Sequence, residues 1–70
     1  MNKKLDTGDV YRLCNVNDWF TCGTVSQYNK MFDMVRENRP IHDIALVIWF
    51  CSDGRDSEED IRIALECATR

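Results

Sequence analysis

Four helix-start signals, each followed by apolar residues at helical spacing, constrain the fold of this chain more than any other feature. Asp6 stands three residues before Asp9, which places a capping side chain and an acid at a helix N-terminus. The apolar stripe that follows predicts a first helix over residues 7–17. Thr24 and Gln27 match a capping box, and the next stripe predicts a second helix that ends near residue 38.

Two further signals lie in the second half of the chain. Pro40 suits the first turn of a helix and Gly54 suits a stop, which predicts a third helix over residues 40–52. Ser57 stands three residues before Asp60, much as in a capping box, and a narrow apolar stripe follows it. The sequence therefore predicts an all-α fold, a compact bundle of about four short helices with an apolar third helix at its centre.

The third of these helices has an alternative. Residues 46–50 are rich in β-forming side chains, so a buried strand is the competing interpretation of this run. A strand needs a partner, and only residues 19–25 offer one, interrupted by Gly23. The alternative fold is therefore α+β with a minimal two-stranded sheet.

Length and hydropathy place the chain among small soluble domains. Seventy residues fit one domain spanning 1–70. Met1–Lys4 could open a signal peptide, but no apolar stretch follows, and the longest apolar run has eight residues. Eight residues are too few to cross a membrane. We therefore expect a cytoplasmic protein with no membrane association and with its four cysteines reduced.

The motifs that carry enzyme or metal chemistry are missing from the sequence. The four cysteines have no zinc-knuckle spacing, and nothing couples the sole histidine, His42, to a cysteine nucleophile. The acidic stretch over residues 53–60 departs from a calcium-binding loop, since Arg55 stands at a ligand position. The three glycines are isolated, so no phosphate-binding loop is present. We expect no enzyme activity, no metal and no cofactor.

Residues 34–65 are similar to helix-turn-helix units, in which a pair like Ile44–Ala45 lies in the helix before the recognition helix. The resemblance implies a DNA-binding regulator as the alternative function. The sequence departs from this pattern because Trp49 and Phe50 stand where the turn belongs. Residues 40–70 also carry three basic and seven acidic side chains, within a chain of net charge −3. That charge makes nucleic acid an unfavourable partner.

The third predicted helix is apolar on every side. Ile41, Ile44 and Ile48 form one stripe for the core, and Leu46 and Phe50 lie opposite them, flanked by Trp49 and His42. Two alternatives follow. Either the other helices wrap this one completely, or its second face is exposed and binds another protein.

The function that these patterns favour is a non-enzymatic protein–protein interaction module. It would be a small regulatory or inhibitory protein of phage or mobile-element type that docks an aromatic and acidic surface on a partner, which is a protein with a basic surface or a second copy. Aromatic anchors surrounded by polar groups are typical of such interfaces. The candidate partner-binding residues are His42, Leu46, Trp49, Phe50, Asp53, Asp56, Glu58 and Glu59.

Overall fold

Four helices and no strand make up the part of the chain that the computed structural model describes, residues 4–70. The helices are α1 (Thr7–Val16), α2 (Val25–Arg36), α3 (Ile41–Phe50) and α4 (Glu58–Cys67). The all-α prediction is confirmed, and residues 46–50 are helical rather than extended. The start of the signal peptide considered above, residues 1–3, lies outside the described residues.

Local capping explains where α1, α2 and α4 begin. The Asp6 carboxylate accepts a hydrogen bond from the Asp9 backbone N–H at 2.8 Å. The Thr24 hydroxyl accepts from the Gln27 N–H, and the Gln27 side chain accepts in return from the Thr24 N–H. The Ser57 hydroxyl accepts a hydrogen bond from the Asp60 backbone N–H, in the first turn of α4, at 3.1 Å. Each bond satisfies a donor that a helix N-terminus leaves free, so the predicted starts are within one residue of the observed ones.

Two helices end in a left-handed turn that the sequence pattern did not predict. Asn38 has φ +65°, and Arg39 donates its N–H to the Met34 carbonyl. Asp18 has φ +56°, and Trp19 donates to the Cys14 carbonyl in the same way. This Schellman-type geometry closes the helix and reverses the chain. It explains why α2 ends two residues earlier than predicted and how Trp19 comes to point into the core.

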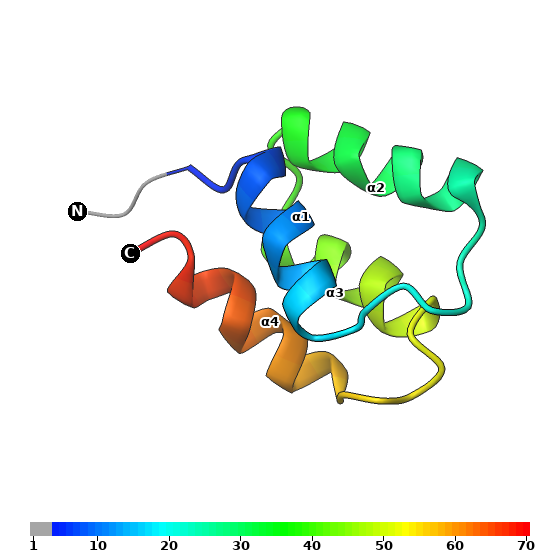
Figure 1. The fold of residues 1–70 in the computed structure, drawn as a ribbon. Helices are drawn as coiled ribbons and strands as arrows, with labels where there is room; N and C mark the ends of the chain where they lie inside the picture. Colours follow the sequence, from blue (N-terminus) through cyan, green and yellow to red (C-terminus); the bar gives the residue numbers. More distant parts are fainter. Residues whose placement is uncertain (1–3) are drawn as a thin grey trace.

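The helices form a bundle in which α1 and α3 each pack against both α2 and α4. Figure 1 shows α1 crossing in front, with α2 on one side and α4 on the other. Apolar residues from every helix, together with Trp19, meet in one buried core. Its fully buried large side chains are Met31, Ile44, Ile48, Ile61, Leu65 and Val10. Burial of these side chains supplies most of the free energy that holds the helices together.

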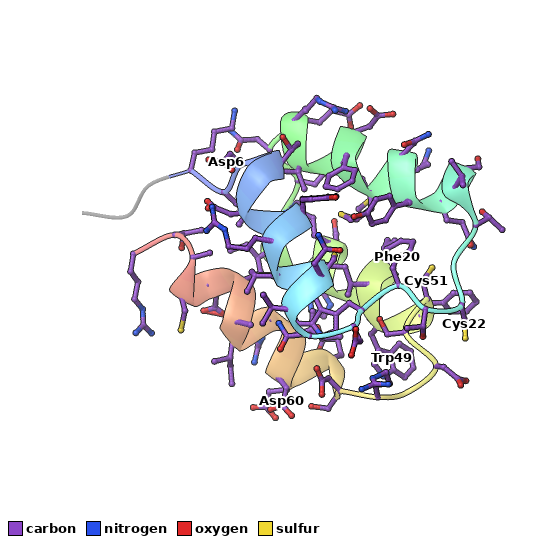
Figure 2. All side chains as sticks on the ribbon, in the orientation of Figure 1. Asp6, Phe20, Cys22, Trp49, Cys51 and Asp60 are labelled. Carbon is purple, nitrogen blue, oxygen red and sulfur yellow. The ribbon has the colours of Figure 1, made fainter. Side chains whose placement is uncertain are left out.

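Three hydrogen bonds tie the α1–α2 loop to the α3–α4 loop. Trp19 donates its indole N–H to the Asp56 carboxylate at 2.7 Å. Ser52 is completely buried, and its hydroxyl accepts the Phe20 N–H at 2.9 Å while donating to the Ile48 carbonyl. The Cys22 N–H also donates to the Cys51 carbonyl, and Figure 2 shows these two residues at the same end of the molecule. The C-terminal end of α3 is thus held by a distant loop.

Candidate partner-binding surface

The outward face of α3 exposes three large apolar side chains. Leu46 is 40% exposed, Trp49 42% and Phe50 73%, whereas Ile44 and Ile48 on the opposite face are buried. The spacing 46, 49, 50 places all three on one side of a helix. Of the two arrangements predicted for this helix, the structure therefore shows the one in which its second face is exposed, because the other helices do not cover that face.

The remaining large apolar side chains that are exposed do not gather in this way. Tyr11 and Val16 belong to α1, Val25 begins α2, and Ile63 lies on α4. Single exposed apolar residues are ordinary on protein surfaces, whereas a cluster of them marks an interaction site. The cluster on α3 is therefore the candidate interaction site on the part of the chain that the structure describes.

An apolar groove of about 380 Å³ runs between α2 and α3 beside this face. Residues from both helices line the groove. On the α3 side they are Leu46, Val47, Phe50 and Cys51, and on the α2 side they are Ser26, Gln27, Lys30 and Met34. Lys30 is the only charged residue of this lining, and it forms no ion pair within residues 4–70. The sequence alone does not indicate Lys30, because the groove exists only where two helices meet.

His42 and Glu58 join α3 to α4 at one edge of the exposed face. The His42 Nδ1 atom lies 3.0 Å from a Glu58 carboxylate oxygen, and the Glu58 side chain is three-quarters buried. Both residues were predicted to surround the partner surface. The structure places them at that edge but already in contact with each other, so Glu58 offers little free carboxylate to a partner.

The other three predicted acids divide into two groups. Asp53 and Glu59 are exposed, Asp53 in the turn directly after α3 and Glu59 in the first turn of α4. Asp56 instead accepts the hydrogen bond from the Trp19 indole described above. One carboxylate oxygen of Asp56 is therefore already used within the chain, where it supports the buried Trp19. Asp53 follows the aromatic residues of α3 closely in the chain, whereas the Glu59 carboxylate lies 3.9 Å from the Arg62 guanidinium on its own helix.

The four cysteines differ in burial, and burial lowers the reactivity of a thiol. All four are free, with Cys14 and Cys51 buried and Cys22 and Cys67 exposed. Burial raises the pKa of Cys14 to about 12, which leaves its thiol protonated and unreactive near neutral pH. Burial and the nearby Cys22 also raise the pKa of Cys51. Among residues 4–70, no cluster of three or more His, Cys, Asp or Glu side chains is arranged to hold a metal ion.

Comparison of the chain with protein-family models, with curated proteins and with solved structures finds no match. Within residues 4–70, none of the helices combines the length and the apolar character needed to span a membrane. The features of this chain that bear on function are therefore the α3 face and its groove.

Proposed function

We propose that this protein is a non-enzymatic interaction module that docks the outward face of α3 on another protein. The observation that carries the proposal is the exposure of Phe50, Leu46 and Trp49 side by side on one helix. Taking about 200 Å² for each whole side chain, their exposed fractions leave on the order of 300 Å² of apolar surface in water. A patch of this size is within the range of functional patches on monomeric proteins.

Charge indicates what kind of partner suits this face. Asp53 follows Phe50 by three residues, and Glu59 lies on the first turn of α4, where two further acids accompany it. Residues 40–70 carry a net charge of −4. The proposed partner is a protein that presents an apolar pocket or ridge with Lys and Arg at its edge, because opposite charges guide association and fix orientation.

Small size, acidic charge and an aromatic docking face together fit a regulatory or inhibitory protein of phage or mobile-element type. Such a protein acts by covering the partner's surface and needs no catalytic group of its own. A cytoplasmic location is part of this proposal, and it is supported by the four unpaired cysteines.

Site-specific photocrosslinking in the cells that make the protein tests this proposal. A photoreactive phenylalanine replaces Phe50 in one variant and Val16 in a second. Val16 is a matched control, since each residue is the last of its helix and each is 73% exposed. We expect a protein crosslinked from position 50 and not from position 16.

The captured protein must then bind the purified chain. Phe50→Asp is expected to weaken this binding at least about tenfold, in the range of an interface hot spot, and Val16→Asp is expected to leave it unchanged. Rising salt should weaken binding as well, because the charged residues lie at the edge of the face. Equal crosslinking from both positions, or equal binding by both Asp variants, would overturn the proposal.

A further inference from the structure

The face proposed for partner binding carries both a projecting ring and a groove that a ring can enter. Phe50 is three-quarters exposed and forms the edge of the groove between α2 and α3. We infer that, when no partner is present, two copies of this chain cover this face for each other. Each Phe50 enters the other copy's groove, and Asp53 of one copy faces Lys30 of the other. This inference rests on the same face as the proposed function and concerns its regulation.

The size of the groove suits this arrangement. A cavity of about 150 Å³ is enough to hold a benzene ring. The groove measures about 380 Å³, so it has room for a phenylalanine ring and part of a neighbouring side chain. The lining is apolar apart from Ser26, Gln27 and Lys30, which lie together on α2. A ring that leaves water for this groove therefore gains the free energy of apolar burial.

A twofold axis follows from the position of Phe50. Because Phe50 is itself a wall of the groove, a ring entering from a second copy meets the first ring, and the axis passes between the two. An interface of this kind is isologous, so every contact occurs twice. We take this axis to be perpendicular to α3, so that the two α3 helices run antiparallel and the residue three positions after Phe50 lies opposite the residue three positions before it.

This register brings opposite charges together. Asp53 stands three residues after Phe50, and Val47 stands three residues before it. Val47 lines the groove together with Lys30. Asp53 is exposed and has no ion pair within the described residues, and Lys30 likewise has none. In this dimer, Asp53 of each copy therefore pairs with Lys30 of the other copy. A face that carried charges of only one sign could not form such pairs with a second copy of itself.

The area decides how strong this dimer is. About 300 Å² of apolar surface per copy is well below the roughly 800 Å² per partner that stable complexes bury. The dimer is therefore weak and reversible. A partner with a larger complementary surface displaces the second copy, so self-association keeps the apolar face out of water without blocking function.

Sedimentation equilibrium of the purified chain, from about 10 μM to about 1 mM, tests the inference. The weight-average mass is expected to rise from the monomer's 8.2 kDa towards twice that value. Phe50→Asp is expected to remain monomeric over the whole range, and the matched Val16→Asp is expected to associate like the native chain. A mass of 8.2 kDa at every concentration, or equal disruption by both variants, overturns the inference.

A charge-reversal mixture tests the pairing of Lys30 with Asp53. Lys30→Glu alone and Asp53→Lys alone should each weaken association by roughly tenfold, since each places like charges together twice. An equimolar mixture of the two variants should associate as the native chain does, because both pairs in the mixed dimer are again opposite in charge. A mixture no stronger than either variant overturns the pairing.

Two controls keep these results interpretable. Circular dichroism checks that each variant is folded, and Asp53→Asn removes the charge with a side chain that tolerates the φ of +54° at this position. Asp53→Asn should weaken association less than Asp53→Lys. All of these measurements use the chain alone, so failure to find a partner protein does not affect them. A chain that is monomeric throughout overturns the dimer and leaves the crosslinking test of the proposed function intact.

Discussion

Neighbouring apolar side chains on α3 lie either in the core or on the exposed face, and burial separates the two sets. Ile48 and Phe50 stand two positions apart on one helix, yet the first is fully buried and the second is three-quarters exposed. Trp19 and Trp49 differ in the same way, since Trp19 is buried with its indole bonded to Asp56. Residue type alone does not predict these roles.

Phe50→Asp is expected to change the free energy of unfolding by no more than about 0.5 kcal/mol, because the new carboxylate remains in water. Ile48→Ala, two residues away, should cost about 2–5 kcal/mol through the cavity it creates in the core. Urea unfolding of both variants measures the difference. An unfolded Phe50→Asp protein would show that the α3 face is buried after all.

Trp19→Phe should destabilise the protein by roughly 1–2 kcal/mol, because the Asp56 carboxylate loses its hydrogen bond while apolar packing is largely kept. Asp56→Asn should cost less, since its amide oxygen can still accept from the indole. Chemical denaturation of the two variants provides the comparison. Equal stability of Trp19→Phe and the native chain would contradict the structural role given to Asp56.

Cys14 makes the stability depend on pH in the alkaline range. Burial raises its pKa in the folded state from 9.0 to about 12. Its contribution is therefore fully present below pH 9, and it is lost as the pH rises from 9 towards 12, because only the unfolded chain ionises readily there. The free energy of unfolding should fall by up to about 1.4 kcal/mol per pH unit from this group.

Urea unfolding of the native chain and of Cys14→Ala, at about pH 8 and about pH 10, isolates this effect. The variant is less stable at the lower pH because of its cavity, but its stability should fall less steeply as the pH rises. Tyr28 and Cys51, whose pKa values are also raised by burial, contribute to the remaining slope in both proteins. Identical slopes would contradict the assignment to Cys14.

Three of the four helices in the described part of the chain start with side-chain hydrogen bonds, and backbone hydrogen bonds close their ends. Side-chain caps start α1, α2 and α4, whereas α3 follows Pro40 without a side-chain hydrogen bond. The one helix without such a cap is also the most apolar, and contacts with both α2 and α4 hold it in place. At the start of α3, where Pro40 provides no side-chain cap, packing against α2 and α4 therefore supplies the stabilisation that caps give the other three helices.

Thr24→Ala is expected to cost about 1 kcal/mol, because it removes the hydroxyl that accepts the Gln27 N–H at the start of α2. Thr21→Ala, in the exposed loop just before, is a matched control and should stay within about 0.5 kcal/mol of the native chain. Thermal or urea unfolding measures both. Equal losses at the two positions would mean that the capping box adds nothing to stability.

Across the whole molecule, charge and topology both oppose the DNA-binding alternative. Residues 51–57 separate α3 from α4, a longer connection than the three or four residues of a helix-turn-helix. The fourth helix, which would take the recognition position, begins with Glu58, Glu59 and Asp60. Phosphates would meet carboxylates there, and no counterion release would offset the repulsion.

The protein is therefore expected not to bind duplex DNA at about 0.15 M salt. Filter binding or a mobility-shift assay, repeated at several salt concentrations, provides the measurement. A basic DNA-binding domain run in parallel confirms that the assay detects binding. Sub-micromolar, sequence-dependent binding with a steep salt dependence would restore the helix-turn-helix alternative.

The sequence by itself determined where three helices start and favoured a helix over a strand for residues 46–50, because capping and apolar periodicity act between residues at most four positions apart. Asp6, Thr24 and Ser57 mark three helix starts that the structure confirms, and the same reasoning placed Leu46 and Phe50 opposite the core stripe. It did not determine whether that second face was covered.

Only the tertiary structure decided which surface is free and which residues border it. It left Phe50 exposed, turned Asp56 towards Trp19, thirty-seven positions away, and brought Lys30 beside Val47 in one groove. These outcomes depend on contacts between residues far apart in the chain, which no local pattern encodes. Periodicity shows that a helix has two apolar faces, but only the packing of the other helices determines which of them meets water.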